Sequence, residues 1–379
     1  MQIQKTIHVV SFFYLMIALA SCSSDNKSNP SKNNTSTLSY AKRFTITKEE
    51  NATVLEILGN KGDSAITATF VLYSNNKPTN HQDAYFIKTP VTKVACMSSI
   101  YTTMLAKLGV EKSIIAIDNV DYYNNVFIQQ EVSEHKITEL SIGPKMDVEQ
   151  TIVLNPDLIL TYGMGNPSID VDKKLLQANI PIAISLDHLE ETPLARAEWI
   201  KFFACFFNKE QLADSLFAIT EKKYLDLKKL TEHQTVRPTV LTEIKYGDTW
   251  YVPGGKSYVA NLLADAGANY FWSNEKQTGS MPLPFETVYT KAKDCDFWIN
   301  LYQVNSQKEL LSYDERYGLF NAFKKNKLYN NNKIQNSKGY SNYWEAGITN
   351  PDEVLADLIS IISPALLPNH TLIYYKQIE

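Results

Sequence analysis

The sequence predicts an α/β protein of two lobes joined by a long helix and preceded by a small β element. From residue 90 onward, short apolar segments of strand character alternate with segments of helical periodicity, which indicates mostly parallel sheets covered by helices. The same ordered features occur once in each half of the chain, and the longest helical pattern lies between the halves. The chain has 379 residues, 44% hydrophobic and 21% charged, which is long enough for about two domains.

The first residues have the pattern of a secretory signal. Lys5 precedes an apolar stretch over residues 9–19, which is too short to span a membrane stably. The junction Leu19-Ala20-Ser21-Cys22 resembles the lipobox of bacterial lipoproteins, in which cleavage leaves the cysteine as the lipid-modified first residue. We therefore expect a signal peptide over residues 1–21 and lipid on Cys22. The alternative is a soluble secreted protein that is cleaved nearby.

The segment after the signal is predicted to be a tether. Residues 23–39 are almost wholly Ser, Asn, Lys, Thr, Asp and Pro, a composition that cannot bury a core. We assign residues 22–39 to this disordered tether, which suits a globule anchored to a membrane. Removing residues 1–21 takes away one lysine and leaves a net charge of −5, so nucleic acid is not an expected partner.

Cysteine and histidine usage predicts neither disulfides nor a bound metal or cofactor. With Cys22 assigned to lipid, Cys96, Cys205 and Cys295 are odd in number and lie in apolar surroundings, so we interpret them as buried thiols. The mature histidines fall at no metal-ligand spacing, and none pairs with a cysteine at a zinc-like interval.

The first lobe is predicted over residues 40–190. Residues 40–75 alternate apolar and polar side chains and form the extra β element. Farther on, Ser98 or Ser99 caps a helix that Gly109 closes in the left-handed C-cap position.

The second lobe, predicted over residues 233–379, repeats this pattern. Ser257 caps a helix that Gly267 closes. In each half, a later glutamate opens a short helix that runs into a strand, Glu149 in the first half and Glu286 in the second. The two lobes are therefore expected to be structurally related.

Residues 191–232 are predicted to connect the lobes. Thr192 with Pro193 opens a first helix, and Asn208 with Gln211 forms a capping-box pattern that opens a second. The second helix has roughly 22 residues and spans about 33 Å, enough to cross two adjacent lobes as a stiff strut.

Several segments resemble the periplasmic binding proteins for cobalamin, haem and ferric siderophores: Cys96-Met97-Ser98-Ser99, Met146-Asp147-Val148-Glu149 and Asn155-Pro156-Asp157-Leu158-Ile159. The resemblance rests on the order of these segments along the chain and on the arrangement of lobe, long helix and second lobe. It covers roughly residues 88–365. It is closest to the lipoprotein branch common in Bacteroidetes, through residues 250–258 and Tyr343-Trp344-Glu345-Ala346-Gly347.

This resemblance implies two Rossmann-like lobes that clasp a ligand between them, with a rigid helix that limits closure. It implies an importer subunit that delivers a ferric siderophore, haem or cobalamin to an ABC permease dimer and its ATPase, as a periplasmic, lipid-anchored protein that we expect to be a monomer. In the family, one acidic residue per lobe meets arginines of the permease, a role that falls here on Glu149 and Glu286. A helix-dipole role is the alternative for both.

Large chelates need broad apolar contact with a few polar anchors, and ligands of α/β proteins bind at the carboxyl ends of strands. Ser98 offers free N–H groups at a helix start, and Lys145 is a possible anion anchor or a solvated lysine. The predicted ligand-binding residues are Ser98, Tyr162, Gly163, Met164, Trp250, Tyr251, Tyr302 and Trp344.

Enzyme motifs are missing from the sequence: there is no phosphate-binding loop, no Gly-x-Ser-x-Gly elbow and no His-Glu-x-x-His. We therefore do not expect an enzyme. Two alternatives stay open beside the importer subunit. One is a surface-exposed chelate-binding lipoprotein that acts with an outer-membrane receptor, and the other is an enzyme on a similar two-lobed scaffold.

Overall fold

The computed structural model describes residues 34–35, 38–59, 66–142, 145–164 and 170–379, all within one compact unit, Asn33–Glu379. The predicted signal peptide and Cys22 lie outside the described residues, as does most of the predicted tether.

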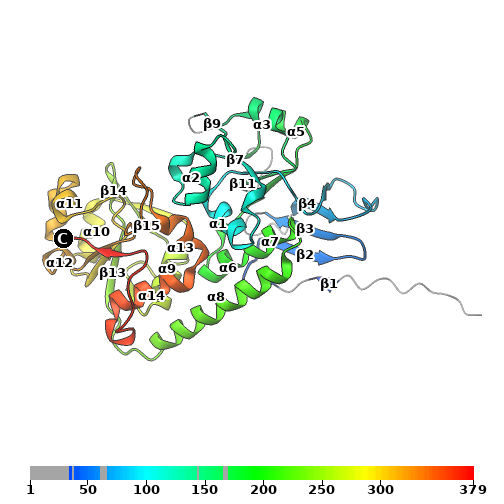
Figure 1. The fold of residues 1–379 in the computed structure, drawn as a ribbon. Coiled ribbons are helices and arrows are strands. Elements are labelled where there is room, and N and C mark those ends of the chain that lie inside the picture. Colours follow the sequence, from blue (N-terminus) through cyan, green and yellow to red (C-terminus); the bar gives the residue numbers. More distant parts are fainter. Residues whose placement is uncertain (1–33, 36–37, 60–65, 143–144, 165–169) are drawn as a thin grey trace, which may run out of the picture. The chain divides into compact units, whose positions relative to one another are not determined.

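A five-stranded sheet precedes the first lobe (Figure 1). Its neighbours are antiparallel except for the last pair, and its strands in order are β1 (Asn34–Thr35), β2 (Phe44–Lys48), β3 (Thr53–Leu58), β4 (Ile66–Tyr73) and β5 (Tyr85–Lys88). The period-2 pattern of β2 turns Phe44 and Ile46 inward, and the Phe44 ring lies 4.7 Å from that of Trp199. The predicted β element therefore exists, but it extends to Lys88 because a parallel fifth strand joins it.

The N-terminal lobe is built on a parallel sheet with the strand order β12-β11-β6-β7-β8. The strands are β6 (Val94–Cys96), β7 (Ile114–Ile117), β8 (Thr138–Glu139), β11 (Leu158–Tyr162) and β12 (Ile182–Ser185). The helices between them are α1 (Ser99–Lys107), α2 (Val126–Ser133), α3 (Val148–Leu154) and α5 (Lys173–Gln177), and a small antiparallel pair joins β9 (Ser141–Ile142) to β10 (Lys145–Met146).

The C-terminal lobe has the sheet order β16-β13-β18-β19-β20, parallel apart from β20. The strands are β13 (Thr239–Thr242), β16 (Asn269–Tyr270), β18 (Phe297–Ile299), β19 (Leu328–Asn330) and β20 (Lys376–Gln377). A second sheet contains β14 (Lys245–Tyr246), β15 (Thr249–Pro253) and β17 (Ser280–Leu283). The helices are α9 (Tyr258–Asp265), α10 (Phe285–Ala292), α11 (Gln307–Tyr313), α12 (Asn321–Lys324), α13 (Ala346–Thr349) and α14 (Pro351–Ile362).

The same hydrogen-bond arrangement around an aspartate occurs in both lobes. Asp157, which leads into β11, accepts the N–H groups of Thr92 (3.1 Å) and Lys93 (2.9 Å) just before the central strand β6. Asp296, which leads into β18, accepts the N–H (2.8 Å) and hydroxyl (2.8 Å) of Thr239 at the start of the neighbouring strand β13. The hydrogen bonds of each aspartate thus link two neighbouring parallel strands at their amino ends.

The connector consists of α6 (Pro193–Glu198), α7 (Ile200–Cys205) and α8 (Glu210–Thr231). Thr192 caps α6 as expected, because its hydroxyl accepts the N–H of Ala195 (3.2 Å). The 22 residues of α8 match the predicted length, and the helix packs against α7 of the N-terminal side and α14 of the C-terminal lobe (Figure 1). The predicted capping box is wrong: Asn208 lies in left-handed backbone (φ 56°), and α8 starts after Lys209 without a side-chain cap.

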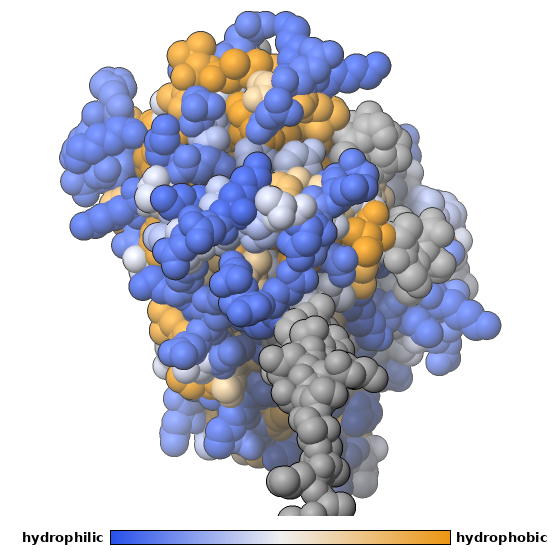
Figure 2. Space-filling model, turned by 90° about the vertical axis from the view of Figure 1, so that its right-hand side faces the viewer, coloured by the Kyte–Doolittle hydropathy of each residue, from blue (hydrophilic) through white to orange (hydrophobic). Residues whose placement is uncertain are grey.

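Each lobe has its own hydrophobic core, and the N-terminal sheet shares the core of the first lobe. Among the described cysteines, Cys96, Cys205 and Cys295 are free and buried. Figure 2 shows one face of the molecule, where hydrophilic residues dominate and hydrophobic residues gather in separate patches, which is normal for a surface in contact with water.

Candidate functional site

A cavity of about 890 Å³ lies in the N-terminal lobe, a size typical of small-molecule sites. It borders the carboxyl ends of β6, β7 and β11. Met97 follows β6, Asp118 follows β7, and Tyr162 is the last residue of β11. Lys145 also lines it, beside apolar side chains such as Met146. The predicted Tyr162 and the possible anion anchor Lys145 therefore face one cavity.

Asp118 contributes a half-buried carboxyl to this cavity. Its Oδ1 accepts the Tyr123 hydroxyl (2.6 Å), and burial raises the pKa of Asp118 although this hydrogen bond opposes the shift. A carboxyl poised in this way beside a lysine and a tyrosine can accept or donate hydrogen bonds to a polar ligand group.

The other predicted residues near this cavity have different surroundings. Ser98 is the N-cap of α1, but its side chain makes no capping hydrogen bond. Gly163 approaches Asp170 so closely that an added Cβ would lie 2.4 Å from the Asp170 Cγ atom, so a glycine is needed there for packing. Met164 is exposed.

The structure removes Trp250 from the predicted ligand-binding set. Trp250 is 0% exposed and lies in the C-terminal core, its ring 5.6 Å from that of Trp298 and its indole N–H donating to Thr242 O (3.1 Å). Tyr251 is 46% exposed. Both lie on β15, and successive side chains of a strand point to opposite faces, so only one of the two can reach a ligand.

In the C-terminal lobe, the carboxyl ends of β13 and β18 carry residues in left-handed backbone. Glu243, Asn300 and Tyr302 have φ values of 62°, 60° and 56°. Such conformations cost about 1–3 kcal/mol each in a non-glycine residue and cluster at functional sites. Burial raises the pKa of Glu243 to about 8, opposed only by Asn300, so this carboxyl is mostly protonated at neutral pH.

Exposed aromatic side chains from both lobes meet beside these strand ends. Tyr122 of the N-terminal lobe and Tyr340 of the C-terminal lobe form an edge-to-face pair with ring centroids 4.9 Å apart. Burial raises the pKa of Tyr340, and Tyr122, Asp121 and the predicted Tyr302 add to this rise. The chain next to Tyr302 reaches the same region, because a Cβ added to Gly339, the residue before Tyr340, would lie 3.8 Å from the side-chain amide nitrogen of Gln303. We call Tyr122, Tyr302 and Tyr340 the seam tyrosines. The predicted Trp344 is also exposed, and its ring packs edge-on against buried Tyr343 (4.8 Å).

Hydrogen bonds join the lobes at this seam. The side-chain amide of Asn336 donates to Asp121 O (2.8 Å) and Tyr123 O (3.0 Å). Glu345 accepts the N–H groups of Asn124 (2.6 Å) and Asn125 (3.2 Å). Sequence patterns did not single out Tyr122, Tyr340 or Glu243 as site residues, because the seam forms only when two distant segments fold together.

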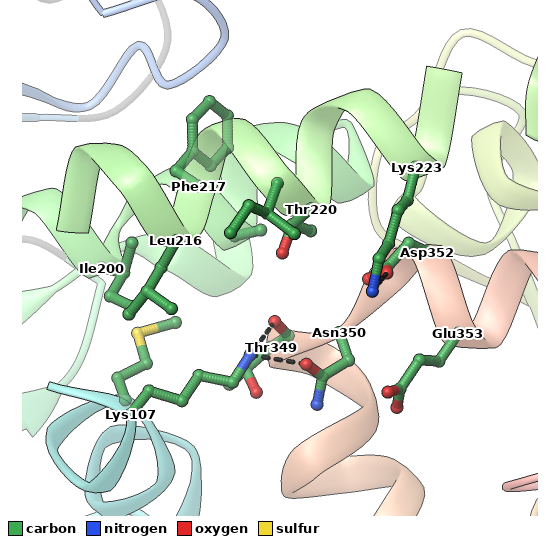
Figure 3. Close-up of a pocket in the computed structure, with 13 residues that line it drawn as sticks. Lys107, Ile200, Leu216, Phe217, Thr220, Lys223, Thr349, Asn350, Asp352 and Glu353 are labelled. Carbon is green, nitrogen blue, oxygen red and sulfur yellow. Dashed lines mark hydrogen bonds and ion pairs between the residues drawn. The ribbon is translucent and has the colours of Figure 1, made fainter. Parts of the chain in front are cut away.

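A second cavity, of about 340 Å³, lies where the lobes meet the connector (Figure 3). Lys107 at the end of α1 donates to Thr349 O (2.6 Å) and Asn350 Oδ1 (2.6 Å) of the other lobe. Burial lowers the pKa of Lys107 to about 8, against the opposing charges of Asp352 and Glu353. The lining of this second cavity is partly apolar, with side chains such as Phe217 of α8.

Glu149 and Glu286 occupy equivalent places in the two lobes. Each is the second residue of a short helix, α3 or α10, that runs into a strand of the parallel sheet. Their side chains are 78% and 75% exposed and pair with Lys174 (2.5 Å) and Arg316 (3.2 Å). Because these pairs are exposed, they add little stability, and the carboxylates remain accessible to a partner.

Two lobes with parallel sheets, joined by one long helix and with open polar and aromatic groups at strand ends, define a two-lobed binding protein of the helical-backbone class. The family model for periplasmic binding proteins matches residues 94–333, more than half of the chain, and the chain belongs to this family.

An uncharacterised lipoprotein of Methanocaldococcus jannaschii is 28% identical over 290 residues, which cover 73% of this chain and 66% of that protein. Among solved structures, a possible iron-binding periplasmic solute-binding protein of Staphylococcus epidermidis aligns with a TM-score of 0.55 and 16% identity, over 73% of this chain and all of that one. A periplasmic binding protein of Veillonella parvula aligns with a TM-score of 0.57 and 14% identity, over 83% of this chain and 98% of that one. At such identities the structures establish the shared fold.

Within the described part of the chain, no group of three or more His, Cys, Asp or Glu side chains is placed to hold a metal ion. The described helices also include none that is both long and apolar enough to cross a bilayer.

Proposed function

We propose that this protein captures a metal chelate (a ferric siderophore, haem or cobalamin) between its lobes and delivers it to an ABC permease. The observation that carries the proposal is the meeting of exposed tyrosines from both lobes, Tyr122 opposite Tyr340 with Tyr302 close by, beside the carboxyl ends of the parallel strands. Ligands of α/β proteins bind at such strand ends.

The chemistry of the seam suits a large, partly apolar chelate. Tyrosine rings supply broad contact area at low entropic cost, and their hydroxyls supply hydrogen bonds. The half-buried carboxyl of Glu243 and the strained loop of Tyr302 add polar groups nearby. Among the described residues no group of three or more His, Cys, Asp or Glu side chains could hold a metal ion, and we propose that the metal arrives inside its chelate.

Two solved structures of the same fold support the chelate class. One is a periplasmic haem-binding protein of Vibrio cholerae, with a TM-score of 0.52 and 15% identity over 68% of this chain and 97% of that one. The other belongs to an Fe³⁺-hydroxamate transport system of Saccharomonospora viridis, with a TM-score of 0.54 and 15% identity over 72% of this chain and 94% of that one.

For delivery, we propose that Glu149 and Glu286 dock onto a permease dimer, one glutamate on each half. For anchoring, we propose lipid on Cys22 and a periplasmic location. The lipoprotein name of the archaeal relative supports the anchor.

The proposal is tested by titrating the purified full-length protein in detergent with haemin, a ferric trihydroxamate and cyanocobalamin, while recording the absorption spectrum. We expect one of the three to bind. Tyr122→Ala should then weaken binding by about 1–3 kcal/mol, the scale for removing one aromatic contact. Tyr313→Ala, at an exposed tyrosine of α11 outside the seam, is the matched control and should bind as the wild type does. Failure of all three chelates to bind the wild-type protein would overturn the proposal.

A further inference from the structure

Glu345 belongs to the segment Tyr343-Trp344-Glu345-Ala346-Gly347, and its side chain reaches from the C-terminal lobe into the N-terminal lobe. It is 2% exposed. Its Oε2 accepts the N–H of Asn124 (2.6 Å) and its Oε1 accepts the N–H of Asn125 (3.2 Å). The described residues contain no lysine or arginine in an ion pair with it. This carboxylate therefore depends for its hydrogen bonds on backbone of the other lobe.

A buried carboxylate without a cation is costly unless hydrogen bonds replace its lost water. Burial raises the pKa of Glu345, and the bonds from Asn124 and Asn125 counteract this shift. If the turn moved away, the carboxylate and both N–H groups would lose their partners together. Glu345 thus favours one placement of the turn.

The turn that Glu345 binds, residues 121–125, contains Tyr122. Asn125 also caps α2, since its Oδ1 accepts the N–H of Ile128 (3.3 Å). Glu345 therefore binds the turn at the point where the chain enters a helix. Asn336 binds the carbonyls on either side of Tyr122. Tyr122 is therefore fixed from both sides, and its ring is held against Tyr340.

We propose that Glu345 is a positioning residue of the ligand site: it orients the turn of residues 121–125 so that Tyr122 of one lobe and Tyr340 of the other form a single binding surface. This inference rests on the proposed function, because it assigns Glu345 an effect on chelate binding that acts through Tyr122. It gives a physical role to a segment that the sequence analysis used only for a resemblance.

The test is a double-mutant cycle with Glu345→Gln and Tyr122→Ala in the full-length protein, titrated with haemin, the ferric trihydroxamate and cyanocobalamin. Glutamine keeps the size of the side chain but can accept only one of the two N–H bonds. We expect Glu345→Gln to weaken binding about tenfold. In the Glu345→Gln background, Tyr122→Ala should cost at least about threefold less than it costs in the wild type.

A ligand-free measurement separates positioning from general destabilisation. Amide hydrogen exchange should accelerate about tenfold at Asn124 and Asn125 in Glu345→Gln, while exchange in the strands β6 and β11 stays unchanged. Lys107→Met is the matched control, because it removes a different contact between the lobes. Its bonds go to Thr349 and Asn350 at the far end of α13, and not to the turn of residues 121–125 that Glu345 holds. Chelate affinity in Lys107→Met should stay within about twofold of wild type.

Three results would overturn the inference: fully multiplicative effects of Glu345→Gln and Tyr122→Ala, unchanged exchange at Asn124 and Asn125, or an equal loss of affinity in Lys107→Met. Failure of the proposed function looks different, since the wild-type protein would then bind none of the three chelates. If Glu345→Gln does not fold, Asn336→Asp supplies the second variant, because it loses the bonds to the carbonyls beside Tyr122 and should show the same non-additivity with Tyr122→Ala.

Discussion

Glu243 lies in surroundings that disfavour its usual negative charge. It follows β13 in left-handed backbone, and burial raises the pKa of its carboxyl to about 8. In the unfolded chain the carboxyl ionises near pH 4.5, so between about pH 4.5 and 8 the folded state holds a proton that the unfolded state has lost. The free energy of unfolding should therefore fall as the pH rises through this window.

Glu243→Gln should remove this pH dependence, because glutamine is neutral in both states. At pH 7.5 the variant should be more stable than the wild type by about 1–3 kcal/mol, and at pH 4.5 the two should be nearly equal. Urea unfolding at both pH values measures the difference. Glu139→Gln, at an exposed carboxyl of β8, is the control and should follow the wild type. A constant offset between Glu243→Gln and the wild type at all pH values would contradict this account.

Single residues were the hardest level to predict from the sequence. Tyr162 and Tyr302 could be selected because they end or follow recognisable strands. Trp250 and Tyr251 could not be told apart, since both faces of β15 carry aromatic side chains and only tertiary packing decides which face is buried. Tyr122 and Tyr340 carry no local signal, because their pairing depends on how the two lobes meet.

At the scale of elements, the aspartates before β11 and β18 join neighbouring parallel strands in each lobe. Asp296 makes its bonds in a part-buried place, whereas those of Asp157 are exposed. Asp296→Ala should thus lower the free energy of unfolding by about 1–3 kcal/mol, and Asp157→Ala by about 0.5–1.5 kcal/mol. Since both lie at the amino ends of the strands, chelate affinity should not change. Chemical denaturation and chelate titration of both variants check this, and equal losses of stability would contradict the burial argument.

Elements were predictable where a local rule fixes them. Ser257 caps α9 through the N–H of Ala260 (3.2 Å), and Gly109 and Gly267 have positive φ values after their helices, as their sequence positions indicated. The start of α8 was not predictable in this way. Asn208 takes up a left-handed conformation that ends the preceding turn, so its side chain is unavailable as a cap.

At the scale of the whole molecule, the order of strands and helices was accessible from the sequence because alternating periodicity repeats in both halves. The relation of one lobe to the other was not, since it depends on part-buried hydrogen bonds such as those of Glu345 and Lys107 between distant segments. The paired placement of Glu149 and Glu286 follows from the repeat. Each occupies the second position of the short helix that precedes a strand of the parallel sheet, β11 or β18.

The proposed docking onto a permease belongs to the whole molecule, because it needs one glutamate from each lobe. Two exposed carboxylates, one on each lobe, suit a dimeric partner that presents arginines, whereas a carboxylate that serves only the helix dipole contributes about 0.3–1 kcal/mol to its own helix. Glu149→Arg with Glu286→Arg should therefore abolish chelate uptake and association with the permease in membranes while leaving chelate affinity within about twofold. The double variant also loses the exposed ion pairs with Lys174 and Arg316. This loss should change the free energy of unfolding little, because water screens both pairs.

Glu134→Arg with Glu275→Arg makes the same change in net charge at exposed glutamates, one in each lobe, and serves as the matched control. If docking depends on Glu149 and Glu286 themselves, this control should still support uptake, and each single reversal should reduce association less than the double reversal does. Because rim charges act mainly on the encounter rate, raising the salt concentration should slow association of the wild type and narrow its difference from the double variant. Normal uptake by Glu149→Arg with Glu286→Arg would reduce both glutamates to residues that stabilise the starts of α3 and α10.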